Sequence, residues 1–169
     1  KGTKMSKSLG NVIDVHLLAD EFGVDPTRYF LLRDIRFGAD GGFSYDGFLT
    51  RYNADLANDL GNLAHRGLSM TMNWLGGVVP AVGERTPLEE DLVALSQKAV
   101  RGFDDNLDDL QFNTALESLW ELVSAGNKYV DTCAPWALNK KGETARLGTV
   151  QRHVLEICAI AGTLLLPIM

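Results

Sequence analysis

Apolar side chains recur every three or four residues in the last stretch of the chain, and this spacing constrains the fold more than any other feature. They occur there at Leu147, Val150, Val154, Ile157, Ala161 and Leu164. This spacing places apolar side chains on one face of an α-helix, which is stable only when it packs against another apolar face. Similar spacing runs through residues 44–75, 86–103 and 112–134. The sequence therefore predicts a mainly α fold, an antiparallel α-helix bundle with short connections.

Local signals place the ends of these helices. Gly76-Gly77 ends the first, and a loop follows over residues 78–85. Thr86-Pro87-Leu88-Glu89 is a capping box with proline at the first helical position. The third helix must stop before Pro135, because a residue that precedes proline disfavours helical backbone angles.

Residues 1–43 predict a small α+β module before the bundle, so we expect two domains, 1–43 and 44–169. Asp14 is suited to cap a short helix that stops at Gly23. A second helix is expected to start at Asp25-Pro26 and to end near Gly38. Residues 43–45 read as a short strand or an extended segment after a turn.

Composition excludes several functions. The chain has 16 basic and 22 acidic residues, a net charge of −6, which argues against non-specific binding to a nucleic-acid backbone. Recognition of a few unpaired bases remains open. No apolar run is long enough to span a bilayer, so we expect no membrane partner. Cys133 and Cys158 lack the spacing of metal ligands, and we expect two reduced thiols and no metal site.

A loop rich in lysine and serine opens the chain: Lys4, Met5, Ser6, Lys7 and Ser8, followed by Leu9-Gly10-Asn11. Lysines supply mobile positive charge, serines supply hydrogen-bond donors, and glycine permits a close backbone approach. These properties suit the binding of a phosphate chain. The alternative is a solvated basic tail without a ligand.

Two further features suit recognition of bases. Asn58, Asn62 and Arg66 follow one another every four residues and form a polar stripe on the first bundle helix, unless this is simply a solvated face. Pro135 interrupts a helix and presents Trp136 at a bend, where an indole could stack on an unpaired base. The alternative is a tryptophan buried between helices.

The loop at residues 4–8 resembles the second signature of class I aminoacyl-tRNA synthetases. Longer stretches, in matching order, resemble the methionyl-tRNA synthetase family. They are Asp25–Leu32, Asp40–Ser44, Phe48–Arg66, Asn127–Tyr129 and Ala134–Trp136. The resemblance implies that the chain contains three parts of such an enzyme: the ATP-binding loop, a stem-contact module and a helical anticodon-binding domain.

The resemblance also implies roles for individual residues. Lys7 would be catalytic and would contact the phosphates of ATP in the transition state, with Lys4 assisting. Met5 would lie near the adenine, and Ser6 and Ser8 would set the shape of this ATP-binding loop. Trp136 would stack on the first anticodon base of the tRNA, a cytosine, and Asn62 and Arg66 would hydrogen-bond to anticodon base edges.

The family activates methionine with ATP and Mg2+ and attaches it to tRNA in the cytoplasm. Because the first ATP-binding signature and the Rossmann core are missing, we expect a part of a longer enzyme that is inactive and binds no cofactor alone. Two alternatives remain open. One is part of another class I synthetase, of the leucyl, valyl, isoleucyl or cysteinyl type. The other is a non-catalytic helical interaction module.

Overall fold

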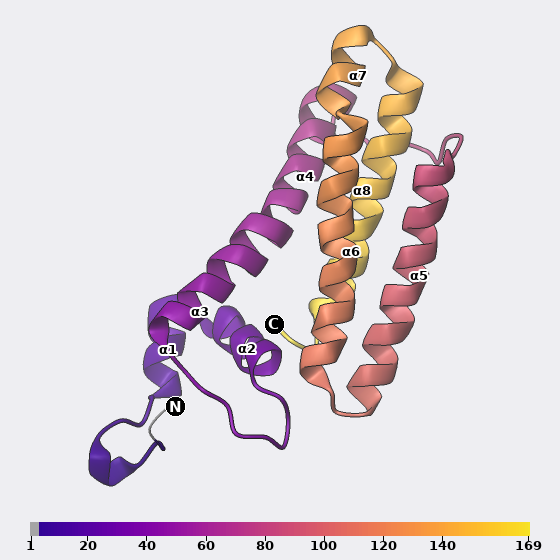
Figure 1. Ribbon diagram of the computed structural model, residues 1–169. Coiled ribbons are helices and arrows are strands. Elements are labelled where there is room, and N and C mark those ends of the chain that lie inside the picture. The colour runs from indigo at the N-terminus through magenta and orange to yellow at the C-terminus, as the bar shows by residue number, and fades with distance from the viewer. Residues whose placement is uncertain (1–3) are drawn as a thin grey trace.

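A computed structural model describes residues 4–169, and these residues are mainly helical (Figure 1). The elements, in chain order, are the 3-10 helix η1 (Lys7–Leu9), α1 (Val15–Phe22), α2 (Val24–Asp34), α3 (Tyr45–Arg51), the π-helix η2 (Tyr52–Gly61), α4 (Asn62–Leu75), α5 (Pro87–Asp108), α6 (Phe112–Cys133), α7 (Pro135–Lys141) and α8 (Thr144–Leu165). None of the helices in the described part of the chain is long and apolar enough to cross a membrane.

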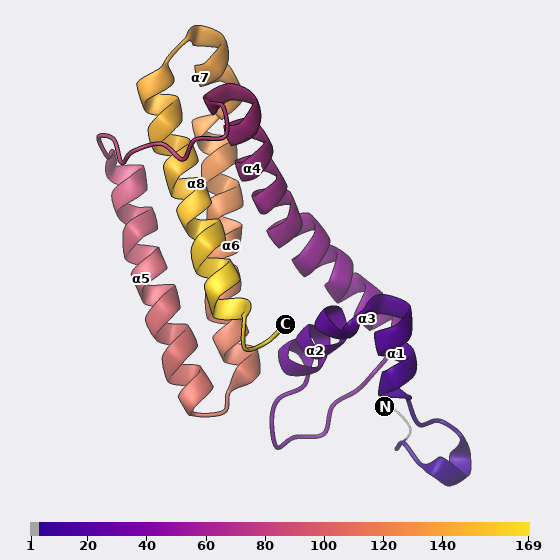
Figure 2. The ribbon, with the colours of Figure 1, turned by 180° about the vertical axis from the view of Figure 1, so that it is seen from behind.

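Helices α4, α5, α6 and α8 form the antiparallel bundle that the apolar spacing predicts, so the mainly α fold is confirmed (Figures 1 and 2). Helix α6 lies at its centre and contacts α4, α5 and α8. The apolar stripe of α8 is buried from Leu147 to Ala161 as expected, but Leu165 and not Leu164 is the buried residue at its end. Most of the stripe shares one hydrophobic core with Leu116, Leu119 and Val123 of α6. Burying such side chains contributes about 1.5–3 kcal/mol each.

The helix ends follow the local signals. Gly76 adopts the left-handed conformation, with φ of 62°, and ends α4. At the start of α5 the backbone N–H of Thr86 donates to the Glu89 carboxylate at 2.7 Å, which completes the predicted capping box. Ala134, with φ of 45°, separates α6 from the short helix α7, which the sequence did not predict.

The predicted long helix does run from the region of Ser44 to Leu75, but its middle is wound as the π-helix η2. The backbone N–H of Asn62 bonds to the carbonyl of Ala57, five residues earlier. Buried Asp55 accepts a hydrogen bond from the Tyr29 hydroxyl at 2.6 Å and lies 3.4 Å from Arg51 Nη1. The Arg51 contact is a local i,i+4 pair, whereas the Tyr29 contact comes from α2, which local spacing cannot reveal.

The first module is helical. Asp14 caps α1 and Gly23 ends it, as predicted, whereas α2 starts at Val24 and ends at Asp34, four residues before Gly38. Of the two alternatives for residues 43–45, no strand forms within residues 4–169, so the β part of the predicted α+β module is absent. The chain there is extended without a partner strand.

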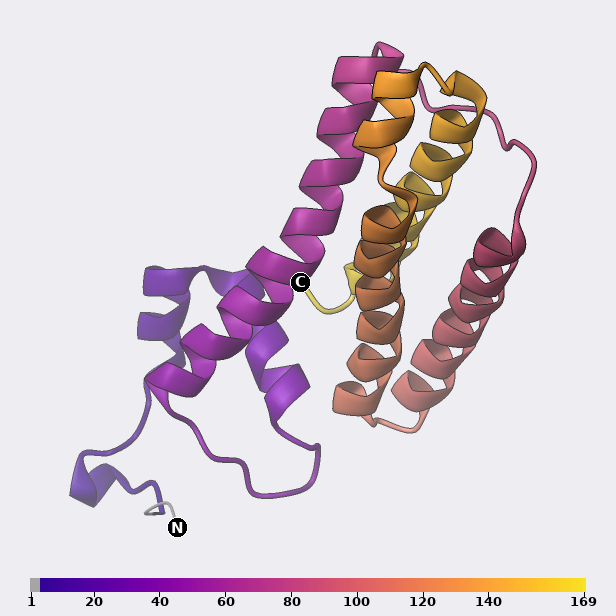
Figure 3. The same cartoon turned by 45° about the horizontal axis from the view of Figure 1, so that its top comes forward.

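Two anchors hold the module. The ring of Phe43 packs edge-on against Phe30, with centroids 5.6 Å apart, and Phe48 lies 5.1 Å from the same ring. Arg28 donates to the carbonyl of Ile168 at 2.7 Å, which fixes α2 to the chain after α8. The N-terminal loop and α7 consequently lie at opposite ends of the molecule, joined by the long helix (Figures 1 and 3).

Candidate functional site

The lysine- and serine-rich loop is closed by the side chain of Asn11. Its Oδ1 accepts from the backbone N–H of Ser6 at 2.8 Å, and its Nδ2 donates to the carbonyl of Lys4 at 3.2 Å. The hydroxyls of Ser6 and Ser8 lie 2.7 Å apart. A single 3-10 turn therefore projects from the module, with Lys4, Met5 and Ser8 exposed.

The side chain of Lys7 lies outside the described part of the structure, so its proposed role rests on the sequence. Its backbone forms the first residue of η1. The bridging role of Asn11 was missed at the level of sequence, although asparagine directly after Gly10 is a frequent partner of turn backbones.

Arg66 is held in a fixed orientation between α4 and α6. Its Nη1 lies 2.7 Å from Asp131 Oδ1, and its Nη2 donates to Asn127 Oδ1 at 2.6 Å. Asn127 in turn donates to the carbonyl of Asp59 at 3.0 Å. The Arg66 side chain keeps 20% of its surface exposed. Because both Nη atoms are held, the plane of the guanidinium is set before any ligand arrives.

Asn62 lies one turn before Arg66 and is exposed, so the predicted neighbours do share a face. Asn58 belongs to η2, where a four-residue spacing no longer preserves one face, and the stripe of three is therefore interrupted. Asn127 and Asp131, four residues apart on α6, complete the arrangement. Their four-residue spacing is visible in the sequence. Their contact with Arg66 is visible only in the structure.

Trp136 is not buried between helices. It stands at the first turn of α7, directly after Ala134 and Pro135, with 49% of its surface exposed. The left-handed backbone at Ala134 turns the chain, and Pro135 starts the new helix with its ring buried. Helix α7 lies beside the C-terminal half of α4 in two views (Figures 1 and 3). Trp136 therefore offers an exposed aromatic surface on a helix that lies beside α4.

A buried polar network surrounds Glu89 of α5. The carboxylate of Glu89, fully buried, accepts from the Tyr129 hydroxyl at 2.5 Å and from Arg146 Nη2 at 2.8 Å. Burial alone would raise the pKa of Glu89, but hydrogen bonds from Arg146, Thr86 and Tyr129 outweigh it and lower that pKa well below its usual range. Burial and the Glu89 carboxylate both raise the pKa of Tyr129. The network joins α5, α6 and α8, and Arg146 Nη1 is buried beside it without a hydrogen-bond partner among the described residues.

Other polar clusters offer less chemistry. Within residues 4–169, no three His, Cys, Asp or Glu side chains gather closely enough to hold a metal ion. Cys133 and Cys158 are free thiols, and burial raises the pKa of both. A raised thiol pKa lowers the fraction of reactive thiolate.

Comparison with known proteins first places the chain among the class I tRNA synthetases. The model of the family described as "tRNA synthetases class I (M)" matches residues 1–68. The model described as "Anticodon binding domain of methionyl tRNA ligase" matches residues 79–169, more than half of the chain. The chain belongs to the methionyl-tRNA synthetase family, and not to that of another class I synthetase.

Individual relatives agree. The chain is 45% identical to the methionine–tRNA ligase of Caldanaerobacter subterraneus subsp. tengcongensis, over 100% of this chain and 27% of that protein. It is 43% identical to the Listeria innocua ligase, over 99% of this chain and 26% of that protein. The chain thus spans about a quarter of the length of the curated relatives it matches.

Solved structures share the fold. The chain superposes on the Mycobacterium tuberculosis methionyl-tRNA synthetase bound by methionyl-adenylate with a TM-score of 0.94 and 41% identity. This match covers 98% of the chain and 34% of that structure. With the apo form of the same enzyme the TM-score is 0.90 at 38% identity, over 94% of the chain and 32% of that structure.

Proposed function

We propose that the protein activates methionine with ATP and attaches it to a methionine-accepting tRNA. In this proposal residues 1–43 belong to the end of the catalytic region and supply the ATP-phosphate loop, and residues 44–169 read the anticodon. The cytoplasm, where tRNA is charged, is the proposed compartment. The observation that carries the proposal is the geometry around Arg66: its guanidinium is held by Asp131 and Asn127, one turn from the exposed amide of Asn62.

This face is suited to base edges more than to phosphates. Asp131 neutralises much of the Arg66 charge, and the whole chain is acidic, with a net charge of −6. Attraction to the RNA backbone is therefore weak, and affinity must come from directed contacts. We propose that Asn62 and Arg66 donate to anticodon base edges while Trp136 stacks on the first anticodon base. Splayed bases of a loop are read in this way by stacking and by edge contacts.

The loop is proposed to bind the phosphates of ATP through Lys4, Ser6, Lys7 and Ser8, with Met5 beside the adenine. Its donors are ammonium groups, hydroxyls and backbone N–H groups, which fit an anion. Residues 4–11 contain no carboxylate, so Mg2+ would arrive bound to the nucleotide phosphates. Lys7 and Lys4 would then stabilise the charge that develops on the departing pyrophosphate.

The test is binding of the full-length protein to an anticodon stem-loop that carries the methionine anticodon, beside one whose first base is changed. Fluorescence anisotropy at low salt measures both affinities. We expect a clear preference for the methionine version that Trp136→Ala abolishes and Trp136→Phe retains in part, because phenylalanine still stacks. Equal binding of the two stem-loops by the unmodified protein would refute the anticodon assignment.

A further inference from the structure

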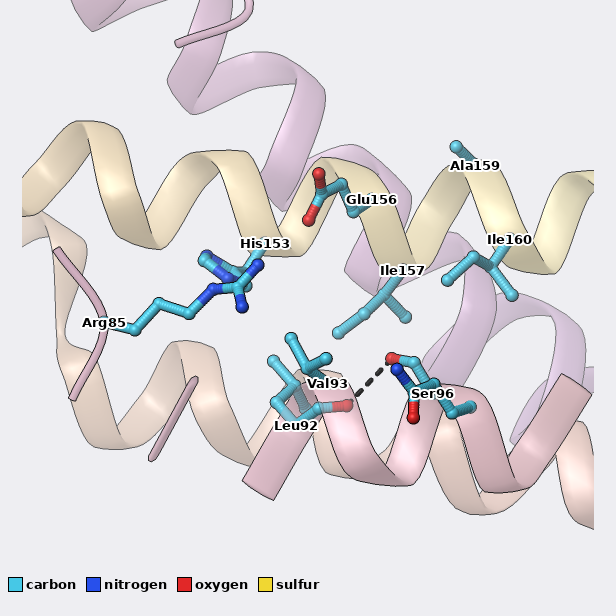
Figure 4. A pocket seen from close by; sticks show the side chains of 10 residues that line it. Arg85, Leu92, Val93, Ser96, His153, Glu156, Ile157, Ala159 and Ile160 are labelled. Atoms are coloured by element: carbon cyan, nitrogen blue, oxygen red, sulfur yellow. Dashed lines mark hydrogen bonds between the residues drawn. The ribbon is translucent and has the colours of Figure 1, made fainter. Parts of the chain in front are cut away.

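A pocket of about 390 Å³ lies between α5 and α8, away from the face that carries Arg66 and Trp136. Its walls are largely apolar and include Leu92 of α5 and Ile157 and Ile160 of α8. Arg85, from the loop before α5, and His153 stand at one end, and Ile160 stands at the other (Figure 4). Glu156 lies along the α8 side between them (Figure 4). A second hollow continues the pocket past Ile160.

The buried imidazole of His153 lines this pocket and has one nitrogen without a hydrogen-bond partner among the described residues. The side chain is only 2% exposed, and its Nδ1 lies 2.9 Å from the carbonyl oxygen of Thr149. A carbonyl oxygen only accepts, so Nδ1 carries a proton, and in the tautomer with a single ring proton Nε2 is an acceptor. Among the described residues, Nε2 has no hydrogen-bond partner. A buried polar atom without a partner is costly, so a ligand that donates to it gains affinity.

Two charged groups accompany this acceptor. Arg85 is exposed and forms no ion pair within residues 4–169, so its five N–H donors are available. Glu156 is oriented by Arg152, whose Nε lies 2.7 Å from Oε1, and its other oxygen is left to accept. Ser96 contributes little, because its hydroxyl already donates to the carbonyl of Leu92 at 2.8 Å.

We propose that this pocket binds a free α-amino acid with an apolar side chain. The carboxylate pairs with Arg85, the ammonium group donates to His153 Nε2 and to Glu156, and the side chain lies against Leu92, Ile157 and Ile160. A cation, an anion and a neutral acceptor around an apolar hollow complement a zwitterion, whereas a simple organic anion would supply no donor to His153 Nε2 or to the second oxygen of Glu156. The site is independent of the anticodon face and of the loop.

The test uses the full-length enzyme with isotope-labelled isoleucine methyl groups, observed by NMR. The probes are L-leucine and two analogues of the same shape. One analogue, 4-methylpentanoate, lacks the ammonium group, and the other, 3-methylbutylamine, lacks the carboxylate. Ile157→Val and Ile160→Val assign the pocket signals, and Ile13 and Ile35 in the first module report binding elsewhere. We expect L-leucine to shift the Ile157 and Ile160 signals saturably. The affinity of each analogue is expected to be lower than that of L-leucine by about tenfold or more.

Variants test the head-group contacts. Arg85→Gln and Glu156→Gln are surface changes that leave the core intact, and each is expected to weaken the response to L-leucine by about tenfold. Arg36→Gln, a change of an exposed arginine outside the pocket, is the matched control and should bind as the unmodified protein does. The proposal fails if L-leucine does not shift the two signals, if the analogues bind equally well, or if Arg85→Gln has no effect.

Discussion

The guanidinium of Arg66 and the carboxylate of Asp131 form an ion pair between α4 and α6, with Nη1 and Oδ1 2.7 Å apart. Asp131 is mostly exposed, and exposed ion pairs contribute little to stability. Its effect is on orientation, because together with Asn127 it fixes the plane of the guanidinium beside Asn62.

Loss of this pair is expected to reduce anticodon selectivity more than stability. Asp131→Ala should lower the preference for the methionine stem-loop by about threefold to tenfold, since Arg66 loses one of its two supports. Stem-loop binding measures this, and the melting temperature should change little. Asp104→Ala on α5 is the control, because this exposed carboxylate lies away from the face. A large fall in melting temperature would show that Asp131 is structural.

Trp136→Ala is expected to weaken binding of the stem-loop by about 1–3 kcal/mol, the usual effect of losing one stacked base. Because α7 lies at the end of the molecule opposite the loop, ATP–pyrophosphate exchange should remain normal. Steady-state aminoacylation and exchange, measured on the same full-length preparation, separate the two effects. Equal losses in both assays would contradict a role confined to the anticodon.

Asn11→Ala is expected to slow adenylate formation and leave methionine affinity nearly unchanged. The substitution removes both hydrogen bonds that close the loop, to Ser6 and to Lys4, and so misplaces the lysines in the transition state. Lys7→Ala should act in the same direction. Pre-steady-state adenylate formation gives both quantities, and His16→Ala serves as a control on α1. A large loss of methionine affinity would show that Asn11 does not act by positioning the lysines in the transition state.

Glu89→Gln is expected to lower the free energy of unfolding by about 2–4 kcal/mol. The loss is smaller than for a fully buried ion pair, because the Arg146 side chain reaches solvent. The lowered pKa of Glu89 stabilises the fold above its unfolded pKa of about 4.3, and this gain is lost as the pH falls toward the folded pKa. Denaturation at several pH values should therefore show the difference between the two proteins shrinking below about pH 4. A difference that is independent of pH would exclude the ionised carboxylate as its source.

Glycine substitutions test the π-helix. A Cβ at Gly61 would lie 2.9 Å from the carbonyl oxygen of Leu56, so Gly61→Ala is expected to destabilise by about 1–3 kcal/mol. Gly162 in α8 has nothing within 4 Å of such a Cβ, and Gly162→Ala should stabilise by about 0.5–1 kcal/mol. Chemical denaturation measures both. Equal effects at the two positions would mean that the wide turn accommodates a methyl group.

The bundle was predictable because its signals are local. The stripe from Leu147 to Leu164, the capping box at Thr86 and the break at Pro135 each act over a few residues. The π-helix was not predictable, because Tyr29 holds Asp55 from a different helix.

The candidate sites divide in the same way. Asn62, Arg66 and Trp136 could be singled out by spacing and by the family resemblance, and their roles, like the division at residues 43 and 44, stay predictions. The partners of Arg66 on α6 and the unused nitrogen of His153 required the tertiary structure.

The π-helix also determines the direction in which α4 presents its side chains. Each residue of an α-helix turns the chain by about 100° about the helix axis, and each residue of the wider π-helix turns it by less. After the ten residues of η2, the side chains of α4 therefore point in a different direction from the one that an α-helix of equal length would give. The direction in which Asn62 and Arg66 point is thus set outside α4, in the segment nearest the first module.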